Sequence, residues 1–397
     1  MYLPVTDSYE SICQSMRLER AVSFRQMKPL HSIVRLINRL ILWGIVLIAV
    51  LQMAASAQSL KSENGDGGPA VAASINGPSG ISIDAKGNVY IAEMMGRRVR
   101  EVNAKAGLIS TVDGNGAECC FKEGMSANSN ALFAPVATAV DFKGNIYIAD
   151  ISAHVRRVDV TNGTSTTVIS DASGDHGDKP DIALSLPAHE QVKGLAVDPS
   201  GVLYISGSSH GRIYIVANGV VSVFAGIGGH GFAGDGKNPK DAQFNWPMNI
   251  ALDSSGALFV ADYENCRIRK IQFGLVSTIA GTGKCGLSGD GGRAIDATVD
   301  HPSAVAVDGD GNVYFNAPAP SCVRRIDGKT TLITNVSGTC ETKDGLTEGP
   351  SGLALDSKGN LYVTEFGTNV VRKVDAKTGK VTIFAGNGLP NRADALL

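Results

Sequence analysis

The amino-acid sequence predicts an all-β protein, a six-bladed β-propeller whose blades are four-stranded antiparallel sheets. The repeating unit is clearest between Asn249 and Gly283, where turn signals separate four short apolar runs: IALD, ALFVAD, RIRKIQ and VSTIAG. Each run is as long as a strand, is rich in Val, Ile and Phe, and is too short for a helix. The unit occurs six times at spacings of 48 to 57 residues, as its turn glycines show: Gly87, Gly144, Gly201, Gly256, Gly311 and Gly359. A repeat of this length with four strands per copy is typical of a propeller with one blade per repeat.

The repeats also resemble the NHL-repeat family. The shared features are Pro-x-x-I/L-A-V-D, D-G-N-V/L-Y-V-A-D, R-I/V-R-K, V-S-T-I-A-G and a loop that contains GDGG. The resemblance extends from about Gly65 to the C-terminus and is strongest in the fourth and sixth copies. It implies a secreted NHL-repeat protein of the bacterial type. It does not imply a ligand, because this family includes binding modules, sensor domains and a few enzymes, and function resides in sites rather than folds.

Residues 1–57 predict a signal peptide. Six basic residues precede the apolar run 40–51, and the small residues Ala55-Ser56-Ala57 follow it. A start at Met27 would give the leader an ordinary length, so we expect Met27 to be the true start. The alternative is an uncleaved membrane anchor, but an apolar stretch of about 16 residues is shorter than the ~20 that span a bilayer. We therefore expect cleavage after Ala57 and a secreted or periplasmic protein, with membrane contact only through an uncleaved leader.

The rest of the chain divides into a lead-in segment at residues 58–78 and the propeller at residues 79–397. The lead-in contains GDGGPAVAAS, which corresponds to a loop between blades, so we expect it to lie over the junction of the last and first blades.

Six cysteines follow the leader, and two pairs occupy equivalent places in neighbouring repeats. Cys266 and Cys322 lie in the turn after the second strand, and Cys285 and Cys340 follow the fourth strand. These two places share a face of an antiparallel meander, which predicts the disulfides Cys266–Cys285 and Cys322–Cys340. Each closes a loop of roughly 20 residues and contributes about 3 kcal/mol to stability, and disulfides indicate an oxidising compartment. The two adjacent cysteines leave open a vicinal disulfide or two free thiols: Cys119 and Cys120.

The innermost strands offer little chemistry. Their axis-facing positions are nearly all Gly or Ala, and no His, Asp or Glu lies on the body of a first strand. Gluconolactonases and the peptide-amidating lyase, which are also propellers, hold their metals with carboxylate or imidazole groups near the axis. We therefore expect no cofactor and no metal. A gluconolactonase-like hydrolase or lyase is the alternative function, and its metal would have to be held by loop residues.

Two further patterns have structural explanations. Each first strand ends in an Asp three residues before the turn glycine, which we interpret as a turn cap rather than a cation site: Asp84, Asp141, Asp198, Asp253, Asp308 and Asp356. The sequence pI of about 6.4 and the lack of a basic stripe argue against a nucleic-acid partner.

Recognition is expected on the face where the long loops after the fourth strands meet the turns between second and third strands, here called the loop face. Four second strands end in an acidic residue that an Arg follows six or seven residues later. This pattern indicates structural ion pairs, and the alternative is that these carboxylates project into the loop face. Phe244 and Trp246 form either a hydrophobic staple under their loop or an exposed anchor. We predict a binding module for a protein, peptide or glycan, with these candidate residues: Glu93, Arg98, Asp150, His210, Trp246, Asp262, Arg267 and Glu365.

Overall fold

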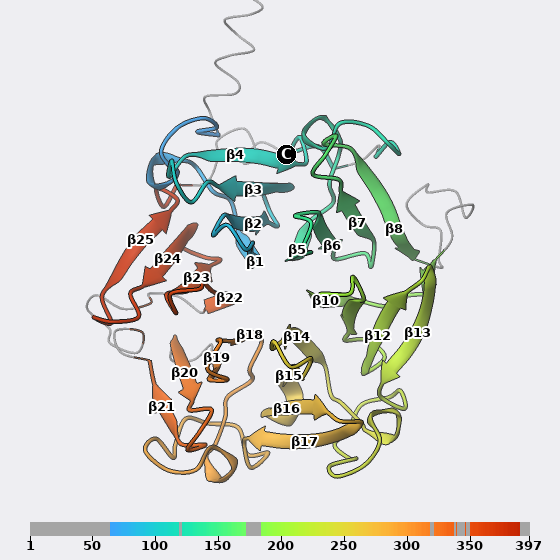
Figure 1. Ribbon diagram of the computed structural model, residues 1–397, viewed down its shortest axis with the longest axis vertical. Coiled ribbons are helices and arrows are strands. Elements are labelled where there is room, and N and C mark those ends of the chain that lie inside the picture. The colour runs from blue at the N-terminus through green and yellow to red at the C-terminus, as the bar shows by residue number, and fades with distance from the viewer. Residues whose placement is uncertain are drawn as a thin grey trace, which may run out of the picture. The chain divides into compact units, whose positions relative to one another are not determined.

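Six four-stranded blades surround a common axis (Figure 1). The computed structural model describes residues 64–118, 121–171, 184–317, 321–336, 339, 346 and 350–389, all within the unit Lys61–Leu397. In each blade the strands pair antiparallel in chain order, with the first strand nearest the axis. The predicted fold class, a six-bladed propeller of four-stranded antiparallel blades, is confirmed.

The blades follow one another along the chain. Blade one comprises β1 (Pro78–Ile83), β2 (Val89–Glu93), β3 (Arg98–Val102) and β4 (Ile109–Asp113). Blade two comprises β5 (Pro135–Val140), β6 (Ile146–Asp150), β7 (Val155–Val158) and β8 (Ser165–Asp171), to which the short β9 (Ser185–Leu186) adds in parallel. Blade three comprises β10 (Val192–Val197), β11 (Leu203–Gly207), β12 (Arg212–Ala217) and β13 (Val220–Ala225).

Blade four comprises β14 (Pro247–Leu252), β15 (Leu258–Asp262), β16 (Arg267–Gln272) and β17 (Leu275–Ala280). Blade five comprises β18 (Val305–Val307), β19 (Val313–Ala317), β20 (Cys322–Ile326) and β21 (Ile333–Asn335). Blade six comprises β22 (Pro350–Leu355), β23 (Leu361–Glu365), β24 (Val370–Val374) and β25 (Val381–Ala385).

The described helices are 3-10 turns of three residues: η1 (Ala70–Ala72), η2 (Ala127–Ser129), η3 (Pro239–Asp241), η4 (Tyr263–Asn265) and η5 (Ala294–Asp296). Among the described residues, no helix has the length and apolar character needed to cross a membrane. The predicted signal peptide at residues 1–57 lies outside the described residues.

The turn between the first and second strands has the same construction in all six blades. In blade one, Asp84 Oδ1 accepts hydrogen bonds from the backbone N–H groups of Lys86 and Asn88, at 2.9 and 2.8 Å. Gly87 follows with φ at 86°, which a glycine adopts without strain. The other five turn aspartates accept the equivalent pair of backbone N–H groups. Their interpretation as turn caps is confirmed.

Small residues allow the innermost strands to converge. A Cβ atom at Gly80 would lie 2.6 Å from the carbonyl oxygen of Val136 in blade two. At Gly194 it would lie 2.8 Å from Asn249 Cα in blade four. Contacts this short are not tolerated, so the Gly and Ala content of the first strands follows from packing around the axis.

The ring closes through the lead-in segment. The backbone N–H groups of Gly386 and Asn387, just after β25, donate to the carbonyl oxygens of Ala70 and Ala73, at 2.9 and 3.0 Å. Gly77 N–H donates to Asn369 Oδ1 of blade six at 2.8 Å. The described part of the lead-in, residues 64–78, therefore lies at the junction of blades six and one, as expected.

Candidate functional site

The predicted acidic residues lie beneath the loop face. Glu93, Asp262 and Glu365 are buried. Their carboxylates pair with the arginines seven residues later: Glu93 with Arg100 at 2.9 Å, Asp262 with Arg269 at 3.2 Å and Glu365 with Arg372 at 3.0 Å. The structural ion pairs are confirmed in blades one, four and six. In this structure these three carboxylates support the loop face from below and are not exposed on it.

Blade two differs, and the expected pair between Asp150 and Arg156 is wrong. Asp150 Oδ1 accepts hydrogen bonds from the backbone N–H groups of Ser152 and His154, and its second oxygen lies 3.4 Å from His154 Nδ1. Arg156 instead donates to the carbonyl oxygen of Ala131 at 2.8 Å. The turn between the second and third strands is one residue shorter in this blade, which brings an imidazole to the carboxylate.

Blade three replaces the pair with a residue from another part of the chain. Gly207 and Tyr214 stand where other blades have the acid and the arginine, and Glu190, from the segment before β10, fills the space. Tyr214 Oη donates to Glu190 Oε2 at 2.8 Å, and His210 Nδ1 lies 3.0 Å from the same oxygen. A Cβ at Gly207 would lie 2.6 Å from the Glu190 carboxyl group. Sequence analysis missed Glu190, and its only signal was the absence of an acid at position 207.

Arg98 and Arg267 hold the loops that leave the fourth strands. Arg267 Nη1 donates to the carbonyl oxygen of Asn265 at 3.0 Å, and Nη2 donates to that of Thr282 at 2.8 Å. Arg98 makes the equivalent bonds to Gly96 and Asn115, at 2.8 and 3.2 Å. Arg98 is buried, whereas Arg267 is half-buried and keeps part of its surface on the loop face.

The aspartates of the GDG loops bind arginines. Asp66, Asp235 and Asp290 pair with buried arginines of the following third strand, Arg100, Arg269 and Arg324, at 2.6, 2.8 and 2.6 Å. The separation is 34 residues in all three cases. This constant spacing is visible in the sequence and identifies these loops as arginine-binding elements.

The exposed part of the loop face centres on Trp246. Phe244 is buried in the core between blades three and four, so it forms the hydrophobic staple under its loop. Trp246, in contrast, is 38% exposed. The Trp246 indole stacks on the His230 ring, with centroids 5.9 Å apart and planes 15° apart. Trp246 has φ at 54° and precedes a proline. Blade one has Gly77 in the equivalent position, with φ at 59°.

Four further side chains lie around Trp246 and His230. We call the whole group the loop-face cluster: His230, Phe232, Trp246, Tyr263, Arg267 and His301. The Arg267 guanidinium lies 3.7 Å above the centre of the exposed Phe232 ring. The Tyr263 and His301 rings have centroids 5.1 Å apart. A backbone hydrogen bond connects the Tyr263 pair to Trp246, since Tyr263 N–H donates to the Trp246 carbonyl oxygen at 3.4 Å. The cluster therefore presents aromatic, imidazole and guanidinium groups from blade four and from the loops that precede and follow it.

Asp262 fixes the backbone beneath this cluster. Its carboxylate accepts hydrogen bonds from Asn245 N–H at 2.8 Å and from Asn265 Nδ2 at 2.9 Å. Burial raises the pKa of Asp262 to about 6, against the lowering effects of these bonds and of Arg269. The buried carboxylate thus ties the residue before Trp246 to the 3-10 turn that carries Tyr263.

The Cys266–Cys285 disulfide is present, with Cα atoms 5.2 Å apart, and joins the 3-10 turn to the loop after β17. Cys322 is also disulfide-bonded. Its predicted partner Cys340, like the adjacent pair Cys119 and Cys120, lies outside the described residues.

The described residues contain one close group of three potential metal ligands: Cys266, Cys285 and His301. Both thiols are consumed by the disulfide, so this group retains a single imidazole. Within the described residues, no other three His, Cys, Asp or Glu side chains place their ligand atoms this close together.

Comparison with known proteins agrees with this architecture. The family model of the teneurin NHL domain matches residues 107–286, which run from the last strand of blade one to the end of blade four. Together with the six four-stranded blades, this match supports an NHL-repeat β-propeller.

Among individual proteins, mouse teneurin-1 is 28% identical to this chain over 236 residues, which is 53% of this chain and 8% of teneurin-1. Mouse teneurin-3 is 28% identical over 241 residues, which is 52% of this chain and 8% of teneurin-3. The match thus covers only a small part of each teneurin.

Two solved structures share the fold at low sequence identity. A structural-genomics protein of unknown function from Bacteroides thetaiotaomicron aligns with a TM-score of 0.56 at 16% identity, over 79% of this chain and 73% of that one. A gluconolactonase from Xanthomonas campestris aligns with a TM-score of 0.50 at 12% identity, over 78% of this chain and 87% of that one. At these identities the likeness extends to the fold alone.

Proposed function

We propose that this protein is an exported binding module whose loop-face cluster docks onto a protein or peptide partner. The observation that supports this most directly is the indole of Trp246, which is 38% exposed on the loop face. A left-handed conformation costs a residue other than glycine about 1–2 kcal/mol, and blade one places a glycine at the same point. Blades two and five have Ala134 and His301 at this position, also with positive φ, so the backbone conformation belongs to the repeat and the proposal rests on the exposed indole.

The composition of the cluster fits protein recognition. Trp, Tyr and Arg dominate the residues that contribute most to protein–protein affinity, and the cluster contains all three. Its side chains are anchored in advance: Arg267 is held by two carbonyl oxygens, and the disulfide at Cys266 holds the turn that carries Tyr263. Anchored side chains lose less conformational entropy on binding, which raises affinity.

The test is affinity capture with the immobilised full chain, followed by a direct binding measurement with each purified protein that is retained. Trp246→Ala is expected to weaken binding at least tenfold. The matched control is Phe273→Ala, which removes an aromatic ring that is 89% exposed in the turn between β16 and β17, away from the loop face. If Trp246→Ala binds as the wild type does, or if only Phe273→Ala loses binding, the loop-face cluster is not the site.

We also propose export to an oxidising compartment, as a secreted or periplasmic protein of the bacterial type. The Cys266–Cys285 disulfide supports this, because such bonds persist outside reducing compartments. N-terminal sequencing of the exported protein is expected to begin at Gln58. A membrane-bound product that retains residues 40–55 would instead show an anchor.

The alternative function, a gluconolactonase-like hydrolase or lyase, has no specific observation in its favour. The described residues offer no set of loop ligands for its metal, and the likeness to a gluconolactonase extends to the fold alone. We therefore do not propose catalysis.

A further inference from the structure

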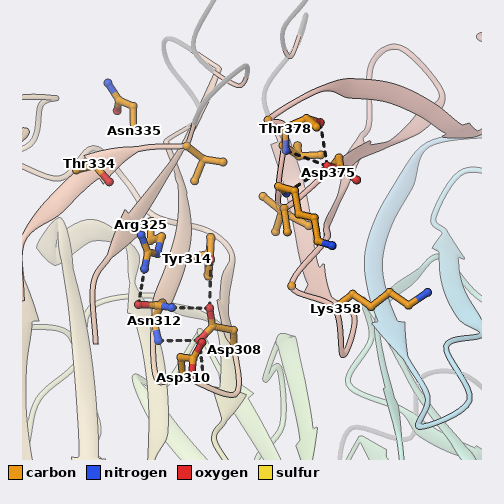
Figure 2. A pocket seen from close by; sticks show the side chains of 17 residues that line it. Asp308, Asp310, Asn312, Tyr314, Arg325, Thr334, Asn335, Lys358, Asp375 and Thr378 are labelled. Atoms are coloured by element: carbon orange, nitrogen blue, oxygen red, sulfur yellow. Dashed lines mark hydrogen bonds between the residues drawn. The ribbon is translucent and has the colours of Figure 1, made fainter. Parts of the chain in front are cut away.

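A cleft of about 590 Å³ opens between the turns of blades five and six (Figure 2). Its polar groups serve their own turns: Asp308 accepts a hydrogen bond from Asn312 Nδ2 at 2.7 Å, and Asp375 accepts one from Thr378 Oγ1 at 2.8 Å. The Lys358 side chain points away from the wall that carries Asp308. Because these groups are bonded within separate turns, they define no common ligand. A closer group of reactive atoms lies in blade four.

That group is the Cys266–Cys285 disulfide with an imidazole beside it. The Sγ atoms of Cys266 and Cys285 and a ring nitrogen of His301 all lie within 4.8 Å of one another. His301 Nδ1 lies 2.8 Å from Asp300 Oδ1. Since a carboxylate accepts the Nδ1 proton, Nε2 is the nitrogen that remains able to take up and release a proton. The disulfide therefore has a proton carrier within reach of its sulfur atoms.

The two sulfur atoms differ in their access to solvent. Cys285 is exposed in the loop after β17, whereas Cys266 is buried at the end of the 3-10 turn η4. A disulfide is opened by a thiolate that attacks one sulfur and expels the other, so access decides which sulfur is attacked. An incoming thiolate therefore reaches Cys285, and Cys266 is the leaving group.

Blade five provides a comparison without the imidazole. Cys322 takes the place of Cys266 in that blade and is also disulfide-bonded. The residue before the proline that opens the next blade is His301 after blade four, but it is Gly349 after blade five. No histidine follows His301 in the sequence. A blade thus holds its disulfide without an imidazole at this position, which argues against a purely structural role for His301.

We propose that Cys285 is a site of thiol–disulfide exchange with a low-molecular-weight thiol, and that His301 carries the proton. His301 takes the proton of the incoming thiol, and the resulting thiolate forms a bond to Cys285 Sγ. The Cys266–Cys285 bond breaks, and its electron pair passes to Cys266 Sγ, which takes the proton from the His301 imidazolium. The products are a mixed disulfide on Cys285 and a thiol at Cys266. The incoming thiol is oxidised and Cys266 is reduced.

This exchange acts on the loop-face cluster without depending on the function proposed for it. The disulfide ties the turn that carries Tyr263 to the loop after β17. Opening the bond removes that covalent link and places the thiol compound on the loop face.

The test treats the full chain with millimolar reduced glutathione at neutral pH. Samples are quenched with acid, alkylated and digested, and mass spectrometry measures the opening of each disulfide and the cysteine that holds glutathione. Glutathione is expected on Cys285. His301→Ala is expected to slow the opening of Cys266–Cys285 at least about tenfold, because proton transfer by a positioned side chain contributes at least that much. The Cys322 disulfide serves as the internal reference, and its rate is expected to stay unchanged.

The variants are matched to the backbone of this position. Ala134 stands at the equivalent point of blade two with φ at 33°, the same value as His301, so alanine is compatible with this conformation. His301→Asn is a second variant without an imidazole, since asparagine also adopts left-handed conformations. The control is His230→Ala, which removes another exposed imidazole of the loop-face cluster and is expected to leave both rates unchanged. Thermal unfolding checks that each variant is folded.

Three results would overturn the proposal. The first is that glutathione does not open Cys266–Cys285 in the wild type, or attaches to Cys266. The second is that His301→Ala and His301→Asn exchange at the rate of the wild type. The third is that His230→Ala slows the exchange as much as His301→Ala does, which would show that the effect does not depend on the imidazole beside the sulfur atoms.

Discussion

The substitution Asp113→Asn is expected to stabilise the protein at alkaline pH and to have little effect near pH 5. Asp113 ends β4, is fully buried, and accepts hydrogen bonds from Gly114 N–H at 2.9 Å and from Ser165 Oγ at 3.2 Å. Burial raises its pKa from 3.8 to about 7, although Arg156 and both hydrogen bonds act in the opposite direction. The folded state therefore retains this proton between about pH 4 and pH 7, where the unfolded chain has lost it.

The sign of the effect follows from proton linkage. When the folded state binds more protons than the unfolded state, stability falls as the pH rises. Each pH unit in that interval costs about 1.4 kcal/mol, so from pH 5 to pH 7 the wild type loses about 3 kcal/mol through Asp113. Above pH 7 the loss is constant, because both states are then ionised. The substituted asparagine keeps the acceptor for Gly114 and carries no charge, so the variant escapes this loss.

The assay is guanidinium unfolding of wild type and variant at pH 5, 6, 7 and 8. The difference in unfolding free energy is expected to shift by about 3 kcal/mol in favour of the variant between pH 5 and pH 8, and to change little between pH 7 and pH 8. A difference that stays constant across all four pH values would refute the reasoning, because it would mean that Asp113 is ionised throughout.

Two further substitutions test the loop-face cluster and the buried arginines. Trp246→Gly is expected to be about 1 kcal/mol more stable than Trp246→Ala, because both lose the indole but only glycine adopts this left-handed backbone without strain; equal unfolding free energies would show that the backbone is not strained. Arg324→Met is expected to cost at least 3 kcal/mol, since the buried guanidinium holds two carbonyl oxygens and Asp290. The adjacent Arg325→Ala, at a side chain that is 35% exposed, is expected to cost at most about 1 kcal/mol, and similar losses for both would contradict the assigned role of Arg324.

Sequence analysis predicted much of the supporting structure beneath the candidate site. The equivalent places of Cys266 and Cys285 in the meander were enough to predict their disulfide, because an antiparallel blade brings those two places to one face. The spacing of seven residues between Asp262 and Arg269 likewise predicted their pair, since it returns the chain across one hairpin. Such contacts depend on the register of neighbouring strands. The recurring pattern of turn residues and strand residues specifies that register.

Two contacts at the candidate site were not predicted. Glu190 occupies the place of a missing acid because Gly207 leaves room for it, and no local pattern marks that exchange. The exchange of Arg156 for His154 at Asp150 depends on a turn that is one residue shorter. The spacing of six residues between Asp150 and Arg156 was visible in the sequence. That it would prevent these two side chains from pairing was not.

The sequence by itself determined the number of blades, the strands of each blade and the capped turns, because these depend on short-range periodicity that recurs six times. Only the tertiary structure decided which side chains reach the surface. Phe244 and Trp246 are two residues apart in one loop, yet the first is buried between blades and the second is exposed on a left-handed backbone. Which of the two is covered depends on how the neighbouring blades pack against that loop.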